Sequence, residues 1–99
     1  MNVNIQSVHF KTDRKLEVFI NDRVSKLSGI FDGVIASEVT LRLDKSGTQE
    51  NKITEIRLVI PGNDLFARKQ CKTFEEATDI AVEALRRQLS RHKEKARGR

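Results

Sequence analysis

The feature of this sequence that most constrains its fold is the hydrophobic period, which changes several times along the chain. Apolar residues alternate with polar ones where a strand is favoured and recur every three or four positions where a helix is favoured. The period is two, then about 3.6, then two in three successive segments, then about 3.6. A chain of 99 residues that is 37% hydrophobic supplies one modest core. We therefore expect a single domain over residues 1–99 with a strand, a helix, three strands and a helix.

The first two segments predict a strand followed by a helix. Residues 3–10 alternate apolar and polar side chains, which indicates a strand with Ser7 as a candidate bulge. Thr12 or Asp13 can cap the helix that follows, and Gly29 can end it. The apolar face of this helix is expected to comprise Leu16, Phe19, Ile20, Val24, Leu27 and Phe31.

Three further strands are expected at residues 35–43, 53–60 and 65–71. The polar stretch 44–51 predicts a loop, and the turn at residues 61–64 folds the last strand back antiparallel to the one before it. The inward positions are expected to be Ser37, Val39, Leu41, Leu43, Ile56, Leu58 and Ile60. The outward positions carry charges of both signs, which we expect to pair across strands on a solvated face. These residues are Glu38, Arg42, Glu55, Arg57 and Arg68.

The last segment predicts a long amphipathic helix. Thr73 and Glu76 fit a capping box, acids crowd the first half and cations the last turns, as the helix dipole favours. Its buried stripe is expected to comprise Ala77, Ile80, Ala81, Ala84, Leu85, Gln88 and Leu89. A helix that continues to Lys95 would be roughly 33 Å long at about 1.5 Å per residue, so its basic end should project from the body. The fold class is α+β, in the order β-α-β-β-β-α, with a four-stranded sheet and both helices on one face.

The positive charge of the chain is concentrated at one end. The net charge is +5, but residues 86–99 hold five Arg and two Lys against one Glu, so the rest of the chain is slightly negative. Clustered cations favour a polyanionic partner, because they displace condensed counterions from phosphates. Arg23 and Lys26 on the first helix could extend this surface towards Arg86 and Arg87. The alternative from charge alone is a solvated tail without a partner.

Several classes of protein are not expected. No apolar run is long enough to span a membrane and the opening residues do not resemble a signal peptide, so we expect a cytoplasmic protein. The lone Cys71, with only His9 and His92 beside it, predicts neither a disulfide nor a metal site. No catalytic motif is present, so we expect no enzyme and no cofactor.

Several short stretches resemble a known family. They are Arg23-Val-Ser-Lys26-Leu27, Phe31-Asp32, Glu38-Val-Thr-Leu41, Ile60-Pro-Gly-Asn, Asp79 and above all Arg87-Gln-Leu-Ser-Arg-His-Lys-Glu-Lys95. In this combination the chain resembles the ribosome hibernation promoting factors, the family that includes ribosome-associated inhibitor A. The resemblance runs from residue 3 to about residue 95, and the chain is similar to the short form of the family.

The resemblance implies a fold similar to double-stranded-RNA-binding domains and a cytoplasmic partner, the small ribosomal subunit with its rRNA. The family's members occupy the tRNA and mRNA channel at the A and P sites, inhibit translation, and preserve or dimerise idle ribosomes in stationary phase or stress. A separate dimerisation factor is an expected partner, and the free chain is expected to be a monomer. The implied rRNA-binding residues are Arg23, Lys26, Arg86, Arg87, Arg91, His92, Lys93 and Lys95. The alternatives are a module for other structured RNA, or a protein-interaction module whose basic end only keeps it soluble.

Overall fold

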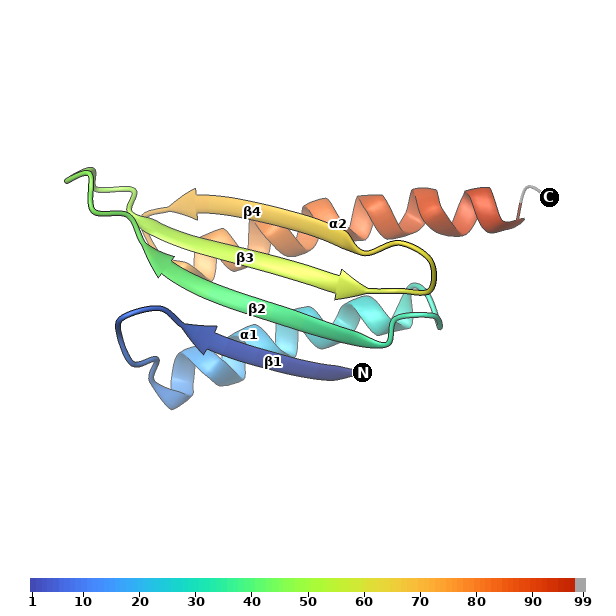
Figure 1. Cartoon of the computed structure of the whole chain (residues 1–99), viewed down its shortest axis with the longest axis horizontal. Helices are drawn as coiled ribbons and strands as arrows, with labels where there is room; N and C mark the ends of the chain where they lie inside the picture. The colour runs from blue at the N-terminus through green and yellow to red at the C-terminus, as the bar shows by residue number, and fades with distance from the viewer. Residues whose placement is uncertain (98–99) are drawn as a thin grey trace.

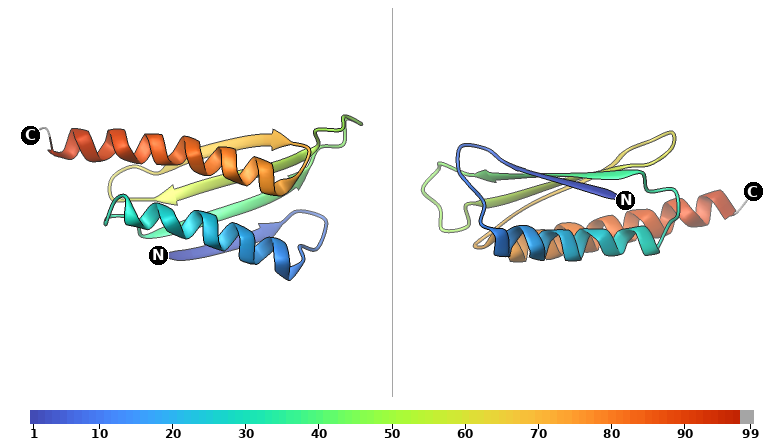
Figure 2. Two further views of the ribbon diagram at one scale, coloured as in Figure 1. Left: turned by 180° about the vertical axis from the view of Figure 1, so that it is seen from behind. Right: turned by 90° about the horizontal axis from the view of Figure 1, so that it is seen from below.

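A four-stranded sheet forms one layer of the computed structural model, and two helices cover one face of it (Figure 1). The strands are β1 (Asn2–Ser7), β2 (Ala36–Leu43), β3 (Lys52–Val59) and β4 (Leu65–Cys71). The helices are α1 (Arg14–Ser25), which continues into a 3₁₀ turn η1 (Lys26–Gly29), and α2 (Phe74–Arg97). The structure describes the backbone of residues 1–97 and the side chains of residues 1–95. The predicted element order and the placement of both helices on one face are confirmed (Figure 2).

The sheet is mixed, in the order β1-β2-β3-β4. β1 runs parallel to β2, with α1 as the crossover between them, and β2, β3 and β4 form the predicted antiparallel meander. Gly62 adopts a φ of 86° in the tight turn between β3 and β4, a conformation that glycine reaches without steric cost. In register, Val39 lies opposite Ile56 and Ile56 opposite Ala67, so apolar side chains line up beneath the helices.

The core lies between the sheet and the helices. Strand residues contribute branched side chains at every second position, while the helices contribute residues three and four apart. The fully buried members include Ile20, Val24, Leu27, Val39, Leu41, Ile56, Leu58, Ala81, Leu85 and Leu89. Thr54 and Thr78 are buried as well, and their hydroxyls lie 3.4 Å apart, within hydrogen-bonding distance. One core therefore holds both helices on the sheet.

The first strand is shorter than its pattern predicts. β1 ends at Ser7, whose hydroxyl donates to the carbonyl of Phe10, and His9 adopts a φ of 67°. The residues between Ser7 and Phe10 therefore form a tight bend instead of the predicted continuation of the strand past a bulge. Asp13, and not Thr12, caps α1: its carboxylate accepts a hydrogen bond from the amide of Leu16 at 2.7 Å.

Two side chains lie further out than predicted. Leu43 is exposed because it ends β2 at the mouth of the loop that follows. Ile80 is 40% exposed because the buried stripe of α2 is narrower than expected and is centred on Leu85. Thr73 caps α2 as predicted, its hydroxyl accepting from the amide of Glu76 at 3.1 Å.

The last turns of α2 extend past the ends of the strands, beyond the turn between β3 and β4, as predicted (Figure 1). This projection gives the molecule a longest dimension of 48 Å against 24 and 19 Å. The expected fraying of residues 96–99 falls outside what the structure describes, which excludes the side chains of residues 96–99 and the backbone of residues 98–99. None of the helices described here is long and apolar enough to cross a membrane.

Candidate nucleic-acid interface

Side-chain packing holds α2 on the rest of the molecule up to the turns that project from it. Leu85 and Leu89 are buried against the sheet. One turn further on, the ring of His92 meets the ring of Phe31 edge to face, with centroids 5.0 Å apart. Phe31 follows η1, so this contact ties the end of α1 to the far half of α2. His92, predicted to contact RNA, is therefore a half-buried packing residue in the free chain.

Four cations on this part of α2 are exposed and make no ion pair among the described residues. They are Arg87, Arg91, Lys93 and Lys95. Since a helix turns by about 100° per residue, they do not form one stripe. Arg91 and Lys95 line a shallow hollow with Asn63 of the β3–β4 turn, whereas Lys93 lies on the opposite flank. Positive charge thus surrounds the projecting helix.

Arg86 differs from its neighbour Arg87 because it is already paired. Its guanidinium donates two hydrogen bonds to the Glu83 carboxylate, at 2.9 and 2.6 Å. These hydrogen bonds lower the pKa of Glu83 and raise the pKa of Arg86 above its usual range. The pair therefore stays ionised at neutral pH and presents almost no net charge to a partner.

Arg23 joins the two helices. It donates to Asp79 of α2 at 3.1 Å and to Asp22 at 2.6 Å, and its guanidinium lies 4.3 Å from the centre of the Phe19 ring. Lys26 is 69% exposed, and its ammonium lies 3.6 Å from the same Asp22 carboxylate. Instead of one cationic ridge across both helices, the middle of the helical layer carries charges of both signs, and unpaired positive charge begins at Arg87.

The open face of the sheet carries the predicted cross-strand pairs. Glu55 accepts hydrogen bonds from Arg42 at 3.0 Å and from Arg68 at 3.2 Å, and Arg57 lies 3.8 Å from Glu38. Phe66 lies among them with 51% of its surface exposed. We did not predict this aromatic side chain, although the alternation that places Arg68 outward places Phe66 there too. The ion pairs leave this face close to neutral.

Few other groups in the described residues suggest chemistry. No group of three or more His, Cys, Asp or Glu side chains in this part of the chain could hold a metal ion. Cys71 is buried, and this burial raises the pKa of its thiol, which disfavours a reactive thiolate. The strongest candidate surface is therefore the cationic end of α2, with three paired cations beside it: Arg23, Lys26 and Arg86.

Comparison with known proteins assigns a family and supports the fold. Residues 3–97 match the family described as Sigma 54 modulation protein / S30EA ribosomal protein. The chain is 28% identical over 95 residues to the ribosome hibernation promoting factor of Pseudomonas putida, which covers 96% of this chain and 89% of the relative. It is also 28% identical over 97 residues to the ribosome hibernation promotion factor of Bacillus subtilis, covering 96% of this chain and 50% of that one.

Two solved structures share the architecture. The N-terminal domain of Thermus thermophilus Protein Y superposes with a TM-score of 0.79 at 22% identity, covering 93% of this chain and 99% of that domain. A ribosomal subunit interface protein from Coxiella burnetii superposes with a TM-score of 0.82 at 15% identity, covering 94% of this chain and 98% of that one. At these identities the likeness supports the fold.

Proposed function

The chain belongs to the Sigma 54 modulation protein / S30EA ribosomal protein family, and on this premise we propose that it is a ribosome hibernation factor without enzymatic activity. It acts in the cytoplasm in stationary phase or stress. It binds the small ribosomal subunit in the tRNA and mRNA channel at the A and P sites and so inhibits translation. It preserves idle ribosomes, singly or as dimers formed with a separate factor. The names of its relatives in Pseudomonas putida and Bacillus subtilis support this role.

The observation that carries the proposal is the set of unpaired cations on the projecting end of α2. These cations approach RNA phosphates without first breaking an ion pair in the described part of the chain, whereas Arg23, Lys26 and Arg86 must exchange a carboxylate for a phosphate. His92, the aromatic residue between Arg91 and Lys93, already packs its ring edge to face against Phe31, so recognition follows the shape of folded RNA more than stacking on bases. With Lys26 as the fifth contact, neutralising about five phosphates gives a log–log salt slope of roughly −3.5 to −4.5.

Sucrose-gradient sedimentation of stationary-phase lysates tests this function. The chain should travel with the small subunit or whole ribosomes, and it should be released as the salt concentration rises. The charge reversal Arg87→Glu with Lys93→Glu should move it to the top of the gradient while the circular dichroism spectrum stays unchanged, because both side chains are exposed.

A matched control keeps the same change in net charge. Lys11→Glu with Lys15→Glu alters two exposed lysines near the start of α1, at the opposite end of the molecule, and should leave sedimentation with ribosomes intact. Release of both double variants to the same extent would mean that net charge, and not the end of α2, governs binding. An unsubstituted chain that stays at the top of the gradient yet binds RNA hairpins would favour a module for other structured RNA.

A further inference from the structure

Phe66 differs from the other phenylalanines of this chain in its exposure. All five lie in the described part of the chain, and Phe66 alone is exposed, with 51% of its surface accessible. The other four make aromatic or cation–π contacts, in the pairs Phe10 with Phe74, Phe31 with His92, and Phe19 with Arg23. The ring of Phe66 makes no such contact with the described residues. It stands on the open face of the sheet, in front of both helices in Figure 1, where it is free to stack on a group from outside the chain.

Strand pairing places an arginine directly beside this ring. Arg57 of β3 lies opposite Phe66 of β4, and neighbouring strands are about 4.8 Å apart. The Arg57 side chain is 55% exposed, and its guanidinium lies 3.8 Å from the Glu38 carboxylate. This distance exceeds the roughly 3.2 Å of a hydrogen bond. Arg57 can therefore exchange its carboxylate for another anion without breaking a hydrogen bond to Glu38.

The surface around Phe66 has a small positive excess and a shallow hollow. Arg42 and Arg68 share the single carboxylate of Glu55, at 3.0 and 3.2 Å, which leaves this face with a net charge of +1 once Arg57 is balanced by Glu38. A hollow of about 220 Å³ opens beside the ring, below the roughly 300 Å³ at which pockets for drug-sized ligands begin. Its lining comprises Glu38, Thr40, Arg42, Glu55, Arg57 and Phe66. A planar group with one negative charge beside it matches this surface.

We propose that the open face of the sheet binds single-stranded RNA, with one base stacked on the Phe66 ring and the adjacent phosphate held by Arg57. An aromatic ring on an open sheet face suits an unstacked base of any kind, because every base has a π-face. The carboxylates beside the hollow accept hydrogen bonds from base amino groups, whereas they repel an acidic peptide. The choice of RNA over DNA rests on the proposed function, but the stacking contact needs neither the ribosome nor the end of α2.

This surface and the cationic end of α2 differ in their response to salt. One phosphate contact with a single strand gives a log–log slope of about −0.7, against roughly −3.5 to −4.5 for the end of α2. Because the helices cover the other side of the sheet, both surfaces can be occupied at once (Figure 2). One stacked base and one phosphate give weak binding, and we expect a dissociation constant on the order of 1 mM. The contact at Phe66 should persist at 300 mM salt, where binding at the end of α2 is strongly weakened.

An NMR titration with a uridine hexamer at 300 mM salt tests this contact. The ring protons of Phe66 and the Nε–H signal of Arg57 should shift together as the RNA is added. Phe66→Leu keeps an apolar side chain but removes the π-face, so it should weaken binding by about fivefold or more, read from the Arg57 signal. Phe66→Trp, with a larger ring, should bind at least as tightly as the unsubstituted chain. Equal affinities of the Phe66→Leu variant and the unsubstituted chain would overturn the proposal.

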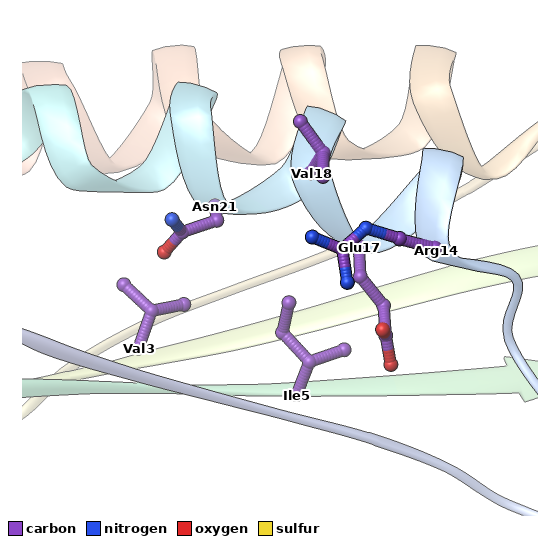
Figure 3. A pocket seen from close by; sticks show the side chains of 6 residues that line it. All are labelled: Val3, Ile5, Arg14, Glu17, Val18 and Asn21. Carbon is purple, nitrogen blue, oxygen red and sulfur yellow. The ribbon is translucent and has the colours of Figure 1, made fainter.

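Val18→Ala is the matched control. Val18 is 58% exposed and lies on α1 beside the groove shown in Figure 3, on the helical side of the sheet. Its truncation should leave the titration unchanged, and a loss equal to that of Phe66→Leu would mean that exposed apolar surface, and not stacking, governs binding.

Two other ligands test the chemistry of the occupant. A glutamate hexapeptide should leave the Phe66 and Arg57 signals in place, and shifts as large as those caused by RNA would overturn the proposal. Tighter binding of a deoxyuridine hexamer would overturn the choice of RNA. Sedimentation with ribosomes depends on the end of α2, so a failure of this contact and a failure of the proposed function give different results.

Discussion

Replacing Glu83 with Gln should increase the affinity of the chain for structured RNA. At present the Glu83 carboxylate accepts two hydrogen bonds from Arg86, at 2.9 and 2.6 Å, and cancels its charge. The glutamine would still accept a hydrogen bond but would not neutralise the guanidinium, so Arg86 could release one more counterion from a phosphate. One phosphate contact changes the slope of log K against log salt by about 0.7 to 0.9. Extrapolated from 1 M to 0.1 M salt, this is a gain of roughly sixfold in affinity.

Fluorescence anisotropy with a labelled RNA hairpin, measured from 50 to 300 mM salt, provides the test. Arg87→Gln should have the opposite effect, a slope that is shallower by about 0.7 to 0.9, because Arg87 has no described ion pair. Glu75→Gln makes the same change in net charge at the far end of α2 and should hardly alter the slope. Equal effects of Glu83→Gln and Glu75→Gln would refute the assignment of paired and unpaired cations.

Three further predictions concern stability. Leu85→Ala should lower the free energy of unfolding by about 2–5 kcal/mol, measured by urea titration. Ile80→Ala, at a 40% exposed site, should lower it by less than about 1 kcal/mol. Similar losses in the two variants would mean that α2 is rotated about its axis. Thr73→Ala should cost about 0.5–2 kcal/mol through loss of the N-cap, measured by thermal unfolding, and an unchanged melting temperature would contradict this. The Gln70 side-chain amide lowers the pKa of Asp44, so this carboxylate stabilises the folded chain above the ordinary pKa of Asp, and the contribution is lost as the pH falls through the lowered value. An NMR titration that gives Asp44 an ordinary or raised pKa would contradict the contact.

The period of the hydrophobic pattern was enough to predict the element order and the faces of most elements. It works where an element is long and one side of it is buried, as in β3 and α2, because a shift of one residue would move apolar side chains into water. It fails at ends. The alternation of residues 3–10 ignores the bend at His9, which depends on local hydrogen bonds and not on side-chain polarity. Ile80 was misplaced because the buried stripe of α2 is narrower than the spacing of apolar residues along the helix suggests.

The candidate site was predictable in its residue types but not in its pairing. Counting charges identifies the basic end of α2, yet it treats Arg86 and Arg87 alike. Only the direction of each side chain on the helix separates them: Glu83 lies about one turn before both arginines, and its carboxylate pairs with Arg86. Arg23 is a similar case, because its partner Asp79 is 56 residues away in the chain. Long-range pairs of this kind follow from the packing of the two helices, which a single sequence does not specify.

The ion pairs of Asp79 and Glu83 also explain how an exposed basic end can coexist with a stable fold. Seven cations close together would repel one another and weaken the helix that carries them. In this chain, the acids Asp79 and Glu83 neutralise cations where α2 still lies on the body, and the unpaired charges begin at Arg87, near the end of the sheet. There the aliphatic packing of Leu89 and the contact of His92 with Phe31 hold the helix. Repulsion among the remaining cations is thus confined to the part of the helix that RNA would neutralise under the proposed function.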